Sequence, residues 1–265
     1  MLILSYVRDI LYNALDQITM SIKQSVKSFF QKQSFAPGFA GIFINPFYFI
    51  RSDLHKNIKK FAPELKGKLL DFGCGRKPYE NLFSVDEYIG MDMESTGHEH
   101  KNSRIDVYYD GKSIPFPDNS FESVFCSEVF EHVFNLDEVL PEIRRVMKPD
   151  GKILVTVPFC WNEHEVPYDF ARYSSFGITH LFERYGFKVL ALKKSGNFAR
   201  VNMQLNALYW YSVIDTKSKA LSYLLRMFFI TPINILGSIL LPLLPSNDSM
   251  YFNNIVLAQK INPGA

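Results

Sequence analysis

Short apolar runs alternate with more polar segments between about residues 61 and 189. In chain order the runs read LLDF, EYIGMD, RIDVYYD, SVFCSE, ILVTVPF and KVLALKK. Runs of this length, separated by helical or loop segments, predict a mostly parallel α/β sheet covered on both faces. Each of the first four runs ends in, or leads into, an acidic or small polar residue. Such residues often only end strands and cap helices, but four in succession favour a ligand site at the carboxyl edge of the sheet.

The first thirty residues show a different period. Apolar side chains recur every three or four positions from Leu4 to Phe29, which predicts one amphipathic helix. Arg8, Asp9 and Asp16 interrupt its apolar side, so the segment lacks the continuous apolar core of a signal peptide. We therefore expect a protein that is not secreted.

A long apolar segment separates the sixth apolar run from one more strand candidate. That candidate is MYFNNIVLAQK at 250–260, some fifty residues after residue 198. The intervening residues include nineteen uncharged positions, 227–245, whose length approaches a membrane span but whose prolines weaken that interpretation. The insertion could cap a substrate pocket, form a dimer surface, be a buried lid, or lie in a bilayer interface. Flanking Lys217, Lys219 and Arg226 suit a position in the bilayer interface. The first helix, which carries lysines in its second half, could lie on the same membrane surface.

Composition narrows the possible classes. The chain has 265 residues, 47% hydrophobic and 21% charged, which suits one main domain with an appendage. The formal net charge of +2, without a dense Lys/Arg stripe, disfavours a nucleic-acid partner. Three cysteines without paired spacing indicate neither a disulfide framework nor a cysteine zinc site, so we expect a reduced, cytoplasmic setting.

The run LLDFGCGRKP at residues 69–78 is a strand followed by a glycine-rich turn. A dinucleotide-binding turn needs a third glycine where Pro78 stands, and we expect a helix to begin at that proline instead. Asp71 would repel a diphosphate but tolerate an ammonium or sulfonium group. These two features disfavour an NAD(P)-linked oxidoreductase. Pro141 lies in the helix expected after the fourth strand, where it should kink or restart that helix.

The run DFGCG at 71–75, together with IPFPDNSFESV, EHV and KPDGKIL, resembles the class I S-adenosylmethionine (SAM) dependent methyltransferases, of the methyltransferase type 11-like group, over roughly residues 65–189. The resemblance implies a Rossmann-like sheet of seven strands, the last antiparallel, and SAM as the cofactor. We then expect an N-terminal extension (1–60), a SAM-binding core (61–198), a hydrophobic helical insertion (199–249) and a last strand with a tail (250–265).

The resemblance also implies roles for single residues. It places Asp71, Gly73, Gly75 and the backbone of Ser127 at the methionine part of SAM, Asp92 at the ribose hydroxyls, and Met93, Asp110 and Gly111 at the adenine. A carboxylate such as Asp92 suits the ribose because its two oxygens accept from both hydroxyls of a diol. Arg76 or Lys77, standing where relatives carry a third glycine, could pair with the cofactor's carboxylate.

Two histidines are candidates for catalysis. His132 follows the fourth strand, near the expected methyl group, and its pKa range suits a general base. His164 lies in the loop after the fifth strand, with the candidate acceptor-binding residues Trp161, Asp169, Arg172 and Tyr173. The loop pattern resembles a subset of these methyltransferases from bacterial surface-glycan and small-molecule pathways. The alternatives are a structural histidine at 132 and a structural lid in which Asp169 and Arg172 pair on a short helix.

No metal is expected from spacing. Neither His164 with its acidic neighbours nor His98-Glu99-His100 matches a zinc motif, and the latter two histidines are interpreted as surface residues. The sequence thus predicts a SAM-dependent methyltransferase acting on a small-molecule, glycan or lipid-linked acceptor, at oxygen, in the cytoplasm and with contact to the inner face of a membrane. The alternative is a non-catalytic SAM-binding or membrane-associated scaffold of the same fold, which the intact acids and glycines disfavour.

Overall fold

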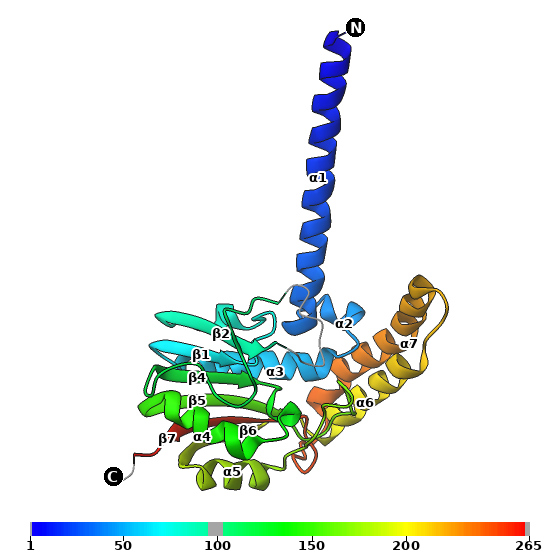
Figure 1. Cartoon of the computed structure of the whole chain (residues 1–265). Helices are drawn as coiled ribbons and strands as arrows, with labels where there is room; N and C mark the ends of the chain where they lie inside the picture. Colours follow the sequence, from blue (N-terminus) through cyan, green and yellow to red (C-terminus); the bar gives the residue numbers. More distant parts are fainter. Residues whose placement is uncertain (1, 95–102, 263–265) are drawn as a thin grey trace.

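A computed structural model describes residues 2–94 and 103–262, with side chains described from residue 17 onward (Figure 1). His98 and His100 lie outside the described residues. Seven strands form one sheet in the order β3-β2-β1-β4-β5-β7-β6. The strands are β1 (Lys68–Phe72), β2 (Glu87–Met93), β3 (Val107–Tyr109), β4 (Phe121–Ser127), β5 (Met147–Pro158), β6 (Phe187–Lys194) and β7 (Asn253–Lys260).

The pairing confirms the predicted fold class. β1 to β5 pair in parallel, whereas β7 lies antiparallel between β5 and β6. The six apolar runs and the candidate segment at 250–260 all become strands, because buried strands of such a sheet need nearly continuous apolar sequence. The order changes direction between β1 and β4, and in open α/β sheets ligands bind at such a point, beyond the carboxyl ends of the strands.

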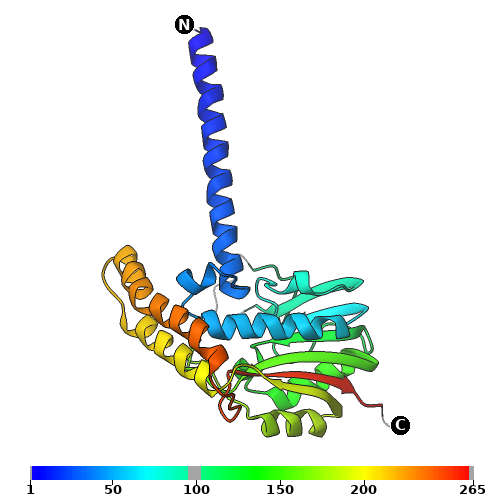
Figure 2. The same ribbon diagram turned by 180° about the vertical axis from the view of Figure 1, so that it is seen from behind.

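Helices cover the two faces unequally. On one face α4 (Leu136–Val146) and α5 (Ser175–Arg184) bury Ile143 and Phe182 in the larger core. On the other face α3 (Tyr48–Phe61), from the N-terminal segment, lies across the sheet (Figure 2). Its Leu54 and Ile58 pack against the sheet. The N-terminal segment is therefore part of the core layer structure.

The prediction that a helix begins at Pro78 is wrong. The chain makes only a short 3₁₀ turn, η2 (Glu80–Leu82), before β2 begins. Lys77 has a left-handed backbone (φ 52°), and its buried ammonium bonds to Asp106, so the chain cannot enter a helix there. Phe83 instead packs on Phe125, with ring centroids 4.8 Å apart, and fills space under α3.

Pro141 neither ends nor restarts its helix. α4 runs through it without a break, and Pro141 lies on the exposed side. A proline in the second turn removes one backbone hydrogen bond near the start of the helix, while Val139, Leu140 and Ile143 hold the opposite side in the core.

The hydrophobic insertion is a helical hairpin of α6 (Phe198–Val213) and α7 (Lys219–Leu240), which ends in η4 (Leu241–Leu243). It projects on the same side of the core as the long α1 (Leu2–Phe35), with the short α2 (Gly41–Ile44) between them (Figures 1 and 2). The remaining 3₁₀ turns are η1 (Ala62–Glu64) and η3 (Phe130–His132). The N-terminal extension and the insertion, distant in sequence, are thus neighbours.

A buried side-chain amide joins the N-terminal segment to the hydrophobic insertion. Gln204 of α6 is fully buried; its Oε1 accepts from the backbone N–H groups of Phe49 (3.1 Å) and Ile50 (3.3 Å), and its Nε2 donates to the Pro46 carbonyl (2.8 Å). Both N–H groups belong to the first turn of α3, which has no carbonyl partners within its own helix. Gln204 therefore caps α3 from the insertion.

Replacing Gln204 with Leu should lower the free energy of unfolding by about 3 kcal/mol, because two buried N–H donors and one carbonyl lose their partners. Chemical denaturation measures the change. Asn206→Ala, at an exposed position of the same helix, is the control and should change stability by less than about 0.5 kcal/mol. Equal losses in both variants would contradict the capping role.

Candidate functional site

The glycine turn after β1 is closely packed at its first glycine and open at its second. Gly73 and Gly75 both have positive φ, 74° and 49°. A Cβ atom on Gly73 would lie 2.3 Å from a methyl carbon of Val129, in the loop after β4, whereas one on Gly75 would meet nothing within 4 Å. The turn therefore leaves room for a ligand on the side of Gly75.

Asp92 joins this turn to the end of β2. Its Oδ2 accepts the backbone N–H of Gly75 (2.9 Å), and its Oδ1 accepts that of Met93 (2.9 Å). Each carboxylate oxygen can accept a second hydrogen bond, so both can still receive a diol. The predicted ribose-binding acid thus lies beside the open glycine.

The predicted adenine residues meet at the ends of β2 and β3. The Cε atom of Met93 lies 3.0 Å from the place where a Cβ on Gly111 would stand, so the two residues are in contact. Asp110 is exposed, and its Oδ1 accepts from the backbone of Lys112 (2.9 Å) and Ser113 (2.8 Å). These bonds, that to Ser113 foremost, lower the pKa of Asp110 and keep it ionised as an acceptor.

Of the two basic residues after Gly75, Lys77 is already paired within the protein. Its buried ammonium bonds to Asp106 and lies 5.5 Å from the centre of the Tyr88 ring. Arg76 is exposed, and its contact with the cofactor stays a prediction.

Asp71 is buried inside the sheet edge rather than open to the ligand space. It is 3% exposed, and its Oδ2 accepts from the Tyr88 hydroxyl at 2.7 Å. Burial raises the pKa of Asp71 to about 7, although the Tyr88 hydroxyl and Lys77 oppose the shift. The carboxyl is therefore half-protonated near neutral pH.

This shift predicts a pH dependence of stability. Between the ordinary pKa of 3.8 and about 7, folded Asp71 keeps a proton that the unfolded chain has lost. Its contribution to the free energy of unfolding then falls as pH rises, by up to about 1.4 kcal/mol per pH unit, and levels off above 7. Denaturation of wild type and Asp71→Asn at pH 5 and pH 8 tests this: the variant's stability relative to wild type should be higher at pH 8. An unchanged difference would exclude the shift.

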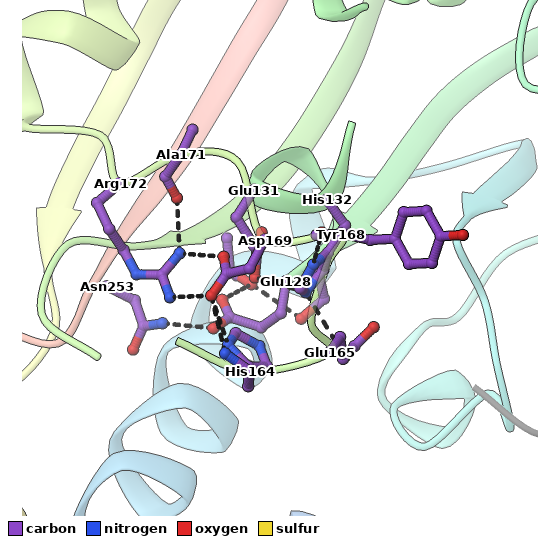
Figure 3. Close-up of polar contacts among 12 residues, drawn as sticks. Glu128, Glu131, His132, His164, Glu165, Tyr168, Asp169, Ala171, Arg172 and Asn253 are labelled. Atoms are coloured by element: carbon purple, nitrogen blue, oxygen red, sulfur yellow. Dashed lines mark hydrogen bonds and ion pairs between the residues drawn. The ribbon is translucent and has the colours of Figure 1, made fainter. Parts of the chain in front are cut away.

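Beyond the end of β4 lies an acidic network that the sequence did not single out. Glu128 has a left-handed backbone (φ 56°); its Oε1 accepts from Thr156 (2.7 Å) and its Oε2 from Asn253 of β7 (2.6 Å) (Figure 3). Ser127 bonds to the same Thr156 hydroxyl (2.8 Å). Glu128 and Glu131 are adjacent to Ser127 and His132 in sequence, and that adjacency was the available signal.

The two candidate histidines come together. The rings of His132 and His164 are edge to face, with centroids 4.8 Å apart, and Glu131 lies beside them (Figure 3). Burial, followed by the neighbouring His132, lowers the pKa of His164, which favours the neutral form of that ring. Burial and then Glu128 raise the pKa of Glu131 well above its ordinary range. Val129, which touches Gly73, connects this cluster to the glycine turn.

The other predicted acceptor residues are held by neighbours. Burial would raise the pKa of Asp169, but the bonds from Arg172 outweigh it and the pKa falls to about 2. Asp169 Oδ2 accepts from Arg172 (2.6 Å) and from the backbone N–H of His164 (2.9 Å), so the pair orients His164. The alternative of a structural lid is right about the Asp169–Arg172 pair, but the segment between β5 and α5 that carries the pair is not helical. Trp161 packs on Phe47 (5.8 Å), and Tyr173 packs against the larger core.

The described residues fit SAM as the cofactor: an open glycine turn, a carboxylate with capacity for a diol, and a methionine and glycine in contact at the adenine position. The contact that each of these residues makes with SAM stays a prediction.

Comparisons with known proteins agree with this geometry. A family model described as a methyltransferase domain matches residues 47–192. The phosphoethanolamine N-methyltransferase 2 of Caenorhabditis elegans is 30% identical over 116 residues, covering 38% of this chain and 26% of that protein. The ubiquinone/menaquinone biosynthesis C-methyltransferase UbiE of Pseudomonas paraeruginosa is 30% identical over 159 residues, covering 52% and 57%.

An uncharacterized protein of Methanocaldococcus jannaschii is 35% identical over 101 residues, covering 38% of this chain and 44% of that protein. Among solved structures, the [4+2]-cyclase SpnF shares the fold, with a TM-score of 0.50, 18% identity and coverage of 80% of this chain and 82% of that one. The matched region spans only about a quarter to three-fifths of these curated relatives. The match over more than half of its residues shows that the chain belongs to the methyltransferase-domain family, within the class I SAM-dependent methyltransferases.

Proposed function

We propose that the protein transfers the methyl group of SAM to an oxygen of a small-molecule, glycan or lipid-linked acceptor. The observation that carries the proposal is the adjacency of two parts: the Asp92–Gly75 turn, which suits the cofactor, and the cluster of Glu131, His132 and His164 beyond β4. Val129 lies between them and touches Gly73. A cofactor site without chemistry, as in a scaffold, would not need buried acid and imidazole groups here.

In the proposed reaction an acceptor oxygen bonds to the methyl carbon as the carbon–sulfur bond of the sulfonium breaks. The acceptor's proton passes to the histidine and glutamate cluster, and S-adenosylhomocysteine leaves. The main tasks of the chain are to align the oxygen with the departing sulfur and to exclude water. The loop that carries His164 and Asp169 covers the cluster and suits the second task.

A cavity of about 390 Å³ supports a lipid-linked or otherwise anionic acceptor. It lies between the end of α1, α2 and the α6–α7 hairpin, and its lining combines aromatic side chains with Arg51 and Arg226. Arg226 lies over the Tyr211 ring (4.3 Å). Burial raises the pKa of Glu128, and the Thr156 hydroxyl and then the charge of Arg51 oppose that shift, so the cavity and the acidic network influence each other electrostatically. Guanidinium groups suit phosphate or carboxylate recognition.

We further propose that the hairpin attaches the protein to a membrane, from the cytoplasmic side. Lys219–Leu243 is the single segment in the described part of the chain that is long and apolar enough to cross a bilayer. Its most apolar 18-residue window has a mean hydropathy of 1.8, and only 22% of that window is buried in the protein. Leu224 and Phe228 are 64% and 70% exposed. Such exposure disfavours the buried lid, and Pro232 with flanking basic residues favours an interfacial position.

The double variant Leu224→Asp/Phe228→Asp should lower binding to anionic vesicles at least tenfold, because two exposed apolar side chains are replaced by charges that lipid repels. Co-sedimentation with phosphatidylglycerol-containing vesicles measures the bound fraction. Phe176→Asp, on α5 and 85% exposed in wild type, is the matched control and should bind normally. Absence of wild-type binding, or normal binding by the double variant, would exclude membrane attachment through the hairpin.

Labelled SAM tests the transfer itself. Purified protein is incubated with labelled SAM and extracts of small molecules, glycans and lipids, and the labelled product is characterised by mass spectrometry. Label on an oxygen supports the proposal, whereas label on carbon or nitrogen, the atoms named for the UbiE and phosphoethanolamine relatives, would correct the acceptor atom. SAM binding without transfer to any extract would favour the scaffold.

A further inference from the structure

Three buried polar atoms without a hydrogen-bond partner gather beyond β4. They are both carboxylate oxygens of Glu131 and the Nε2 atom of His132, judged within the described residues. Glu131 is 0% exposed, so water does not substitute for a partner. A protonated Glu131 would still lack a partner, because the neighbouring acceptor, His132 Nε2, is 3.8 Å from its Oε1, beyond hydrogen-bond distance. Buried polar groups are nearly always paired, so this group points to a missing ligand.

The proton positions on the histidines leave two lone pairs for that ligand. His132 Nδ1 is 2.7 Å from the carbonyl oxygen of Tyr168, which can only accept, so Nδ1 carries the proton and Nε2 is a free acceptor. His164 Nδ1 is 3.3 Å from the Asn162 carbonyl and 3.3 Å from Asp169 Oδ2, again two acceptors. Histidines that bind metals are commonly held in this way, with the other ring nitrogen bonded to a carbonyl or carboxylate.

The spacing of these groups suits one small cation. The ligand atoms of Glu131, His132 and His164 all lie within 4.8 Å of one another. Glu165 Oε1 lies 3.5 Å from His132 Nε2 and could supply a fourth ligand. Metal–ligand bonds of about 2.0–2.2 Å place neighbouring ligands roughly 3–4 Å apart, so a modest contraction would complete the site.

Arg172, the positively charged side chain of this network, donates its hydrogen bonds to groups other than Glu131. Arg172 donates to both oxygens of Asp169 and to the carbonyls of Ala171 and Asn162 (Figure 3). Asp169 in turn orients His164 through its backbone N–H. Arg172 thus supports the loop and leaves the oxygens of Glu131 without a donor.

We propose that Glu131, His132 and His164 bind a divalent transition-metal ion such as Zn²⁺. Two neutral imidazoles with one carboxylate are a donor set that such ions prefer, and it leaves a position open for a substrate oxygen. The ion's role rests on the proposed function: it would hold the acceptor oxygen and lower the pKa of its hydroxyl, and the proton would then leave to solvent before methyl transfer, because the three side chains bind the ion instead of taking the proton. An ammonium group of a substrate is the competing ligand.

Metal binding can be measured without an acceptor. Full-length protein is stripped with a chelator, dialysed against Co²⁺ or Zn²⁺, and analysed by mass spectrometry for bound metal and by visible absorption for Co²⁺ coordinated by nitrogen and oxygen. We expect about one ion per chain, and at least a hundredfold weaker binding in Glu131→Gln and in His164→Ala. His164 lies on a partly exposed loop, so His164→Ala keeps the test valid if Glu131→Gln does not fold.

His180→Ala and Glu163→Gln, at exposed positions on α5 and in the same loop, are matched controls and should bind the ion as wild type does. Binding that is absent in wild type, or unchanged in both ligand variants, would overturn the site. A third outcome is that wild type binds no metal ion but binds an alkylammonium salt saturably, and that Glu131→Gln loses this binding. That outcome would overturn the metal site in favour of an ammonium site. SAM titration of the same samples separates this failure from failure of the proposed function, because the cofactor residues are elsewhere.

Discussion

Replacing Asp92 with Ala should weaken SAM binding by roughly 100- to 1,000-fold. The carboxylate accepts from Gly75 and Met93 and retains one acceptor position on each oxygen for the ribose diol. Hydrogen bonds to a charged group contribute about 1.5–3 kcal/mol each, and loss of two at the lower end of that range, about 3–4 kcal/mol in all, corresponds to this loss of affinity. Isothermal titration with SAM and with S-adenosylhomocysteine measures the change.

Two further variants sharpen the test. Asp92→Asn keeps the shape but cannot accept through its nitrogen, so its affinity should lie between those of wild type and Asp92→Ala. Glu87→Gln removes an exposed acid at the other end of β2, whose partner is Lys68 at 3.0 Å, and should leave SAM affinity unchanged. If Asp92→Ala binds SAM as tightly as Glu87→Gln, the ribose is held by another group.

Replacing Gly73 with Ala should lower the free energy of unfolding by about 3 kcal/mol. Part of the loss, about 1 kcal/mol, comes from placing a side chain at φ 74°. The rest comes from overlap with Val129, whose methyl carbon lies 2.3 Å from the added Cβ and must move with its backbone. Because Val129 is next to Glu128 and the metal-binding cluster, SAM affinity should fall as well.

A double-mutant cycle isolates the overlap. Val129→Ala removes both methyl carbons, so Gly73→Ala should cost about 1–2 kcal/mol less in that background than alone. Gly75→Ala is the control for conformation, since it also has positive φ but open space around the added atom, and should cost about 1 kcal/mol. Additive effects of Gly73→Ala and Val129→Ala would show that the two do not collide.

The strands were predictable from sequence because burial on both faces requires apolar residues at nearly every position. The hydrophobic insertion was predictable for a related reason, since a delayed last strand leaves residues that the sheet cannot hold. The missing helix after β1 was not, because it depends on Lys77 bonding to Asp106, 29 positions away. No local pattern in GRKP indicates that the lysine will be buried.

The cofactor turn was also more visible than the chemistry beside it. Gly73, Gly75 and Asp92 form a motif whose members have fixed positions at the ends of β1 and β2. The cluster of Glu131, His132 and His164 combines a turn after β4 with a loop after β5, so a search for zinc spacing within one segment gave the prediction of no metal. That prediction considered ligands from one segment at a time, and the proposed site, which takes its ligands from two elements, is the alternative to it.

Titration of the purified protein with SAM, and in parallel with NAD, tests the central claim most directly. Saturable binding of SAM and S-adenosylhomocysteine at about one molecule per chain, with micromolar affinity and no measurable binding of NAD, is the expected result. Binding of NAD in preference to SAM, or of neither by correctly folded protein, would contradict the assignment of the turn at Gly73 and Gly75 to a methyl donor.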